Sequence, residues 1–304
     1  MKLFASMLVT VLSIPASAGI IRHDLPDDYY TGFGNTPEFQ SVGLIEMDRG
    51  STQGTCSGTV IHKNWVLTAG HCLTDAKRMG IHLSKDNEWR FYEAKSWVAH
   101  ENYIDQEFYA GWDIGLMHFD VDLQAPIAPL YRDRVEQFNY AYDVGFGLTG
   151  DGYTGIQSAD YLRRAGSNII DVLYSPGGEG DQMLWSDFDH PTDESYNAFS
   201  IDGYTFDDVA TFFEIMIAFG DSGGGLFISD GNQYFLAGVH SLISDVNGDQ
   251  KFGYGDAYAS TRVSSFTAWI DNKINAVSVP EPGTLWLGLL GLAIIAGRRR
   301  GCLA

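Results

Sequence analysis

The sequence has few positive charges. It contains 19 lysine and arginine residues against 39 aspartate and glutamate residues, which gives a formal net charge of −20 at pH 7. Nucleic acids and anionic membrane surfaces are bound largely through clusters of basic side chains. The charge balance therefore argues against nucleic acid and anionic membranes as partners of the main body of the chain, and it disfavours acidic substrates.

Cysteine and proline are also scarce, with 3 and 9 residues respectively, whereas glycine is abundant at 35. No internal repeat is visible. Hydrophobic residues make up 45% of the chain and aromatic residues 13%, which is enough for a sizeable core. A chain of 304 residues can hold one large domain or two small ones, and many short strands joined by turns would give this composition.

The N-terminal segment has the composition of a secretory signal peptide. Lys2 gives a short positive start, residues 3–14 are mostly apolar, and residues 16–18 read Ala-Ser-Ala, which supplies small side chains for cleavage. We therefore assign residues 1–18 to a signal peptide, and a buried N-terminal helix is the alternative. Export would place the chain in an oxidising compartment, where cysteines can pair.

A glycine-rich segment carries a candidate nucleophile. Residues 220–224 read Gly-Asp-Ser-Gly-Gly. Glycine permits unusual backbone conformations, so such a loop can present the Ser222 hydroxyl and aim successive N–H groups at a developing oxyanion. A plain glycine-rich turn is the alternative interpretation. Serine is a weak nucleophile without a base and an orienting acid, so the chain must supply both.

One histidine and one aspartate lie in segments suited to these roles. His71 ends an apolar stretch, and Asp113 opens another. An aspartate is costly to bury without hydrogen-bonded partners, and a histidine N–H is such a partner, which also fixes the imidazole tautomer. Asp105 is the competing acid, but it sits in a polar loop. The histidines that lack a comparable context are His62, His118 and His190.

Three segments together resemble the active-site regions of trypsin-like (chymotrypsin-fold) serine proteases. They are residues 220–224 around Ser222, residues 56–72 around His71 and residues 97–119 around Asp113. Their order along the chain is that of chymotrypsin, and the resemblance covers most of residues 38–276. It implies an all-β fold of two packed six-stranded antiparallel β-barrels with a C-terminal helix and an active site in the cleft between the barrels.

The resemblance assigns a role to each residue. His71 acts as general base toward Ser222 and Asp113 orients His71, while the N–H groups of Gly220 and Ser222 form the oxyanion hole. The implied function is an exported serine endopeptidase that cleaves polypeptides through an acyl-enzyme, without a metal or organic cofactor. A catalytically inactive binding protein of the same fold at the cell surface is the alternative, and a structural surface protein is a third.

The resemblance also implies a disulfide and a substrate pocket. Cys56 and Cys72 have the spacing of a family disulfide beside the catalytic histidine. Met216 stands where trypsin has its cation-binding aspartate, Ile217 follows it, and Ala218 replaces a family cysteine. The pocket should therefore prefer apolar or aromatic side chains over lysine and arginine. A preference for glutamate is the rival, because His240, before Ser241, matches the histidine of glutamate-specific relatives.

In this family an N-terminus freed on activation usually pairs with the aspartate before the nucleophile, here Asp221. No Arg-Ile-Val-Gly-Gly activation site is present, and Ile20 or Ile21 is the candidate new N-terminus after cleavage and trimming.

Residues 245–249 resemble the start of a calcium loop, but the glycine is misplaced for an EF-hand, which favours a solvated turn. Residues 19–37 and 175–208 read as polar, turn-rich stretches. The expected strands are 39–47, 59–68, 140–152, 162–173, 233–241 and 256–263, and a helix is expected over 264–276.

The last segment forms a separate module. Pro-Glu-Pro at residues 280–282, an apolar run over 284–297 and three arginines at 298–300 follow one another. This order resembles the PEP-CTERM sorting signal, which implies an exosortase-type processing enzyme as a partner. The run spans about 21 Å as a helix, short for a hydrocarbon core of about 30 Å. We therefore expect a transient membrane hold by this short transmembrane helix, with the protein working at the cell envelope or outside the cell.

The chain is accordingly divided into three parts. These are the signal peptide (1–18), a trypsin-like serine protease domain (19–276) and the sorting segment (277–304). Cys302 lies beyond the arginines and has no obvious partner.

Overall fold

The computed structural model describes residues 19–85, 88–176, 180–199 and 209–278. The chain divides into two compact units, Met1–Thr267 and Ala268–Ala304. The predicted signal peptide lies outside the described residues, and so does nearly all of the predicted sorting segment. Within the described part of the chain, no helix is long and apolar enough to cross a membrane.

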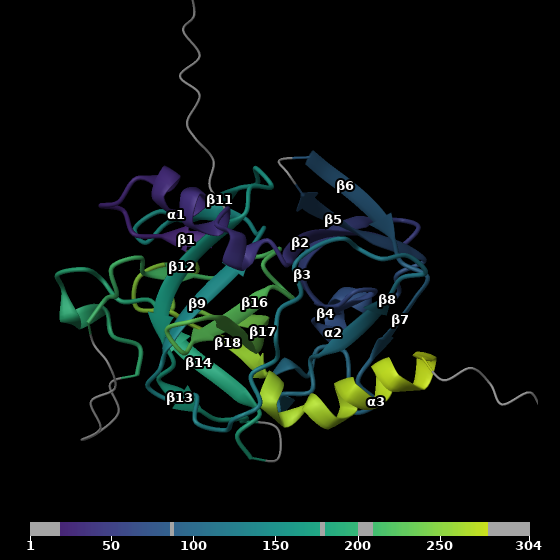
Figure 1. The fold of residues 1–304 in the computed structure, drawn as a ribbon. Helices are drawn as coiled ribbons and strands as arrows, with labels where there is room; N and C mark the ends of the chain where they lie inside the picture. Colours follow the sequence, from purple (N-terminus) through teal and green to yellow (C-terminus); the bar gives the residue numbers. More distant parts are fainter. Residues whose placement is uncertain (1–18, 86–87, 177–179, 200–208, 279–304) are drawn as a thin grey trace, which may run out of the picture. The chain divides into compact units, whose positions relative to one another are not determined.

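The first half-barrel is a seven-stranded antiparallel sheet in the order β6-β5-β2-β3-β4-β8-β7 (Figure 1). Its strands are β2 (Val42–Asp48), β3 (Gln53–His62), β4 (Trp65–Thr68), β5 (Arg78–Lys85), β6 (Glu88–Glu93), β7 (Ser96–Ala99) and β8 (Gly115–His118). All four residues of β4 are buried. A short continuous apolar run of this kind is typical of a strand that is covered on both faces.

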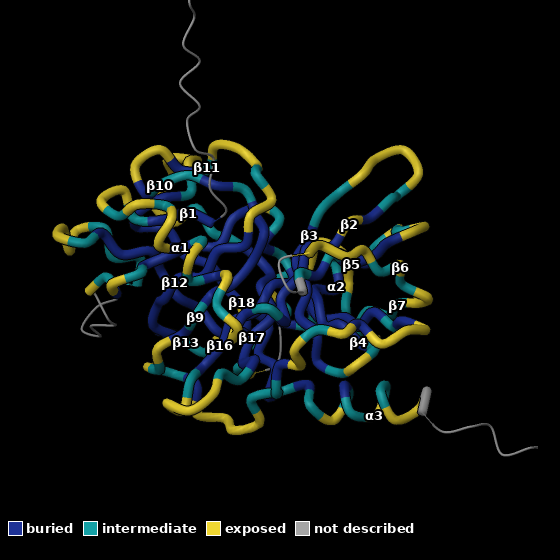
Figure 2. Tube along the Cα trace, turned by 45° about the horizontal axis from the view of Figure 1, so that its top comes forward, coloured by how far each residue is buried: buried dark blue, intermediate teal, exposed yellow. Residues whose placement is uncertain are grey.

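The second half-barrel is a seven-stranded sheet in the order β12-β9-β16-β17-β18-β14-β13. Its strands are β9 (Tyr140–Gly145), β12 (Arg164–Ile169), β13 (Val172–Leu173), β14 (Met183–Asp187), β16 (Gly225–Ser229), β17 (Tyr234–Ser244) and β18 (Ala257–Arg262). Figure 2 shows the buried backbone running through the sheets and the exposed backbone gathered in the connecting loops. The all-β fold of two antiparallel barrels is confirmed, with seven strands in each sheet rather than six.

A third, four-stranded sheet holds the beginning of the described chain. β1 (Gly19–Ile21) lies between β10 (Thr149–Asp151), to which it is parallel, and β15 (Ile215–Met216), to which it is antiparallel; β11 (Gly155–Ser158) completes the sheet. All three residues of β1 are buried. The prediction of a polar, turn-rich stretch over 19–37 is therefore wrong at its start, because long-range pairing covers this short strand.

Two further sequence predictions need correction. The surface loop expected over 175–208 contains β14, which is buried along its length and pairs with β18. The single strand expected over 59–68 is a hairpin, because β3 turns into β4 between His62 and Trp65. In both places the partner strand, and not the local composition, decides the structure.

Short helical segments connect these strands. They are α1 (Asp27–Gly34), α2 (Gly70–Leu73) and the 3₁₀ turns η1 (Pro37–Phe39), η2 (Phe108–Ala110), η3 (Glu194–Tyr196) and η4 (Val263–Ser265). The helix expected over 264–276 is present as α3 (Thr267–Ser278), most of which belongs to the second unit.

Hydrogen bonds join the two half-barrels beside the predicted site. The Ser57 N–H on β3 donates to the Ser222 carbonyl oxygen at 2.8 Å. The Thr261 hydroxyl on β18 donates to the Asp113 carbonyl oxygen at 2.9 Å. These bonds bring segments from both sheets to one place.

Candidate active site

His71 and Asp113 form a closely bonded pair. His71 Nδ1 lies 2.8 Å from Asp113 Oδ2, and the His71 backbone N–H donates to Asp113 Oδ1 at 2.9 Å. The Asp113 side chain is fully buried, whereas the His71 side chain is 21% exposed. A buried carboxylate facing Nδ1 selects the tautomer with the proton on Nδ1, which leaves Nε2 as the free basic nitrogen.

Ser241 is a third donor to the same carboxylate. Its hydroxyl donates to Asp113 Oδ2 at 2.6 Å. The sequence prediction placed Ser241 in the substrate pocket, but this bond directs its side chain toward the His71–Asp113 pair. No local signal could have revealed the contact, since the two residues are far apart in the sequence and come from different half-barrels.

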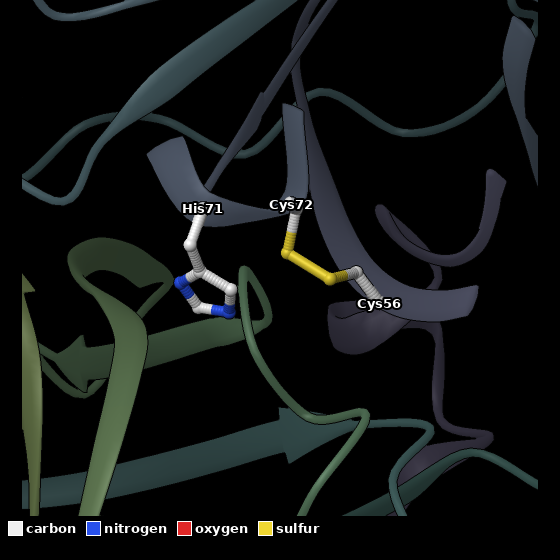
Figure 3. Close-up of side chains that lie close together, drawn as sticks. All are labelled: Cys56, His71 and Cys72. Carbon is white, nitrogen blue, oxygen red and sulfur yellow. A yellow bond between two sulfur atoms is a disulfide. The ribbon is translucent and has the colours of Figure 1, made fainter. Parts of the chain in front are cut away.

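The turn that carries His71 is held by a disulfide. Cys56 and Cys72 are bonded, with an S–S distance of 1.98 Å, so the predicted pairing is confirmed. Figure 3 shows the disulfide beside the His71 ring. Arg49 adds a second tie, because its Nη2 donates to the His71 carbonyl oxygen at 3.3 Å. The histidine is therefore fixed both to β3 and to the turn that follows β2.

Ser222 lies on a tightly packed loop before β16. Gly220 and Gly223 have φ values of +98° and +81°, which favour glycine. A Cβ on Gly223 would lie 2.1 Å from Thr68 Oγ1 and 2.4 Å from the Ser57 carbonyl oxygen. The loop can approach the first half-barrel only because this position lacks a side chain. Among the described residues, no hydrogen bond joins the Ser222 hydroxyl to the His71 ring.

Two backbone donors of this loop are free. The Gly220 carbonyl oxygen accepts from the Ser57 hydroxyl at 3.0 Å and the Ser222 carbonyl oxygen accepts from the Ser57 N–H. Within the described part of the chain, neither the Gly220 N–H nor the Ser222 N–H donates to a protein group. Both donors are thus available to an oxygen anion beside Ser222.

Asp221 turns inward from the nucleophile loop. Its Oδ1 accepts from the Gly147 N–H at 2.7 Å and its Oδ2 accepts from the Ala218 N–H at 2.8 Å. A cavity of about 10 Å³, roughly the size of one water molecule, is lined by Asp221, Asp143 and Gly19 among others. Burial raises the pKa of Asp221 to about 7 and that of Asp143 to about 7.

The predicted pocket residues are buried. Met216 and Ile217 belong to one apolar cluster with Tyr254 and Tyr258. His240 is fully buried; its Nδ1 lies 3.0 Å from the Ser260 hydroxyl and 3.7 Å from Asp143 Oδ1. Burial lowers the pKa of His240 to about 3, so the ring is neutral and offers no positive charge to a glutamate side chain.

The segment expected to be a solvated turn forms a compact loop. Asp245 Oδ1 accepts from the Gly248 N–H at 2.8 Å, and Asp256 Oδ1 accepts from the Val246 N–H at 2.8 Å. A carboxylate oxygen from each of Asp245, Asp249 and Asp256 comes within 4.8 Å of the others. Asp256 is buried, and both of its oxygens are taken by backbone N–H groups.

Comparisons with known proteins agree with this geometry. Residues 35–170 match the family model described as Trypsin, and residues 278–300 match the PEP-CTERM protein-sorting motif. The fold is therefore that of the trypsin-like serine proteases, and the chain carries a C-terminal PEP-CTERM motif.

The relatives found by sequence are chymotrypsin-like enzymes. Chymotrypsin-like elastase family member 1 of Rattus norvegicus is 25% identical over 263 residues, covering 77% of this chain and 84% of the elastase. The Homo sapiens protein of the same name is 27% identical over 291 residues, covering 84% and 97%. Chymotrypsin of Phaedon cochleariae is 40% identical, but only over 84 residues, 24% of this chain and 28% of that protein.

Solved structures share the fold at lower sequence identity. HL collagenase superposes with a TM-score of 0.57 at 18% identity, covering 85% of this chain and 98% of the collagenase. Neuropsin, a serine protease expressed in the limbic system of mouse brain, superposes with a TM-score of 0.54 at 19% identity, covering 78% and 96%.

Proposed function

We propose that this protein is an exported serine endopeptidase that uses His71, Asp113 and Ser222. The observation that carries the proposal is the Asp113 carboxylate, which accepts three hydrogen bonds and holds His71 with Nε2 free. A fully buried carboxylate bound to a partly exposed imidazole is an arrangement suited to general-base catalysis.

The proposed reaction follows from the positions of these groups. His71 Nε2 takes the proton of the Ser222 hydroxyl as its oxygen attacks the substrate carbonyl. The Gly220 and Ser222 N–H groups stabilise the resulting oxyanion. The tetrahedral intermediate collapses to an acyl-enzyme while His71 gives its proton to the leaving amine. Water, activated by His71, then releases the acid and restores the Ser222 hydroxyl.

An inactive binding protein of the same fold is the second candidate. The absent hydrogen bond between the Ser222 hydroxyl and His71 favours it, although such bonds are often long before substrate binds. A fluorophosphonate probe distinguishes the two. A protease should be labelled at Ser222 and should hydrolyse casein or an ester substrate, whereas an inactive protein should do neither.

For substrate choice, we expect an apolar or aromatic side chain before the scissile bond. Neither Met216 nor Ile217 carries a charge that would bind a lysine or arginine side chain, and the neutral His240 gives no support to the rival preference for glutamate. Profiling on a peptide library tests this expectation. Efficient cleavage after arginine would refute both the apolar or aromatic preference and the glutamate preference.

Maturation is proposed to begin with removal of residues 1–18. Gly19 would then carry a free amine beside the cavity that it lines with Asp221 and Asp143. Its nitrogen already donates to the Leu148 carbonyl oxygen at 2.7 Å. An ammonium there would place one positive charge beside the buried carboxylates of Asp221 and Asp143. N-terminal sequencing of active protein should therefore give Gly19, and a form that retains extra residues before Gly19 should be much less active.

The C-terminal motif is proposed to hold the precursor at the membrane until an exosortase removes it. Fusing residues 277–304 to an exported reporter tests this step. A membrane-held precursor should lose the tail only when the exosortase is present. Immediate release of the reporter with its arginines intact would contradict the proposal.

A further inference from the structure

Within the described part of the chain, one buried arginine lacks an acidic partner. Arg164, which is 1% exposed, pairs with Asp27 and Asp160. Its neighbour Arg163, which is 2% exposed, donates only from Nη1 to the Gly34 carbonyl oxygen at 3.3 Å. Among the described residues, nothing accepts a hydrogen bond from Arg163 Nε or Nη2. With 39 acidic residues in the chain, a shortage of carboxylates does not explain this.

The surroundings of Arg163 compensate only part of the cost of burial. Its Cζ lies 5.4 Å from the Phe146 ring centre and 5.8 Å from that of Trp89, within the range of cation–π attraction. Burial still lowers the pKa of Arg163 to about 10. A buried guanidinium without a counter-ion is unfavourable, and a buried donor without a partner calls for a specific explanation, such as a ligand.

The two free nitrogens define the kind of ligand. Nε and Nη2 lie on one edge of the planar guanidinium, and their parallel N–H bonds match the two oxygens of a carboxylate. Trp89, which covers this group, is itself 50% exposed near the start of β6. A displacement of one surface side chain would therefore open Arg163 to a ligand.

Arg163 also lies close to the proposed active site. The Phe146 N–H donates to the Ser57 hydroxyl at 3.0 Å, and the Ser57 N–H donates to the Ser222 carbonyl oxygen. Ser57 is thus the single residue that connects Phe146, whose ring faces Arg163, to the nucleophile loop.

A groove runs beside this place. It has a volume of about 650 Å³ and is lined by Tyr161, Phe91 and Thr55, among others. Tyr161 is two residues before Arg163 in the sequence. Phe91 is two residues after Trp89 on β6, so the side chains of Trp89 and Phe91 lie on one face of that strand. Thr55 precedes Cys56, which ties the groove to the turn of His71. In the proposed reaction His71 protonates the leaving amine, and we therefore place the leaving part of the peptide along this groove.

We propose that Arg163 binds a carboxylate of the polypeptide substrate on the leaving-group side of the scissile bond, with Trp89 moving aside. This inference rests on the proposed protease function. The groove itself carries Glu46, Asp48 and Glu93, which repel a carboxylate elsewhere along it, and its lining residue Arg78 already pairs with Glu93. Arg163, beside the groove, has no acidic partner among the described residues. The carboxylate comes either from an acidic side chain or from the C-terminus of a short leaving peptide.

Binding to the full chain with Ser222→Ala tests the inference without cleavage. Fluorescence anisotropy is measured with peptides that carry glutamate or glutamine at each of the first three leaving-side positions, and with matched peptides that end in a free acid or an amide. In one of these two sets, the peptide with the carboxylate should bind at least about tenfold more tightly than its neutral counterpart, as expected for a charged hydrogen-bonded pair. In the first set this holds at one of the three positions. The first set reports a side-chain source and the second a C-terminal source.

Adding Arg163→Gln to the Ser222→Ala chain should reduce the ratio between the affinities of the carboxylate and neutral peptides to about one. Arg134→Gln is the matched control, because it removes the same charge from an arginine whose side chain is 50% exposed, and it should keep the ratio. If Arg163→Gln fails to fold, Arg163→Lys keeps the charge but loses the paired donors and should also lose the ratio. The inference is overturned if no carboxylate peptide is preferred, or if the preference survives in the Arg163 variants. Cleavage of a neutral peptide by the wild-type chain, measured separately, shows whether the protease proposal holds.

Discussion

Replacing Asp143 with asparagine should stabilise the protein above pH 7 and change its stability little near pH 4. Asp143 is fully buried, and burial raises its pKa from 3.8 to about 7. Its Oδ2 accepts the Tyr258 hydroxyl at 2.6 Å, a bond that the asparagine oxygen can keep, while among the described residues its Oδ1 has no hydrogen-bond partner. The substitution therefore removes the ionisable proton and preserves the one strong contact.

The sign and size of the effect follow from linkage. A carboxyl whose pKa is raised on folding binds its proton more tightly in the folded state, so its contribution to stability is present below the unfolded pKa and is lost as pH rises through the folded pKa. The rise of the Asp143 pKa from 3.8 to about 7 corresponds to about 4 kcal/mol. The stability advantage of Asp143→Asn should thus grow from near zero at pH 4 to about 4 kcal/mol at pH 8.

Urea unfolding of both proteins at intervals from pH 4 to pH 8 measures this difference. Asp133→Asn, at an exposed position, is the control and should show no such trend. A difference that does not vary with pH would refute the reasoning. The same series also tests maturation. In protein that begins at Gly19, an ammonium beside Asp143 should stabilise its carboxylate. The stability that Asp143→Asn gains at high pH should therefore be clearly smaller in this mature form than in the precursor.

Three further predictions concern the site itself. Ser222→Ala and His71→Ala should each lower kcat by several orders of magnitude, and the double variant should be little worse, because the residues act as a unit; a Ser222→Ala enzyme within tenfold of wild type would contradict the assignment. Ser241→Ala should lower kcat/KM about tenfold, because Asp113 loses a buried hydrogen bond, and steady-state kinetics with an unchanged kcat/KM would exclude a positioning role. Replacing Cys56 and Cys72 by serine should cost about 3 kcal/mol in the chain-entropy model, and an unchanged free energy of unfolding would show that the bond does not stabilise the fold.

Local patterns in the sequence were enough for the main features of the site. His71, Cys56 and Cys72 lie within one short segment that resembles the histidine region of the family, and this resemblance predicts the disulfide that the structure confirms. The paired position of Asp113 could be predicted because an acid at the start of an apolar strand needs a buried partner. The glycines around Ser222 likewise indicate a close backbone approach, and the packing of Gly223 against β3 explains why.

Tertiary structure alone decided the features that depend on contacts between distant segments. Ser241 reads as a pocket residue, yet its hydroxyl binds Asp113 across the two half-barrels. β1 and β14 look like parts of polar stretches until their partner strands cover them. Arg163 and Arg164 are adjacent and identical in sequence, but among the residues that the structure describes only Arg164 meets carboxylates. Neighbouring residues on a strand point to opposite faces, so their environments are set by what packs on each face, and a linear sequence does not state that.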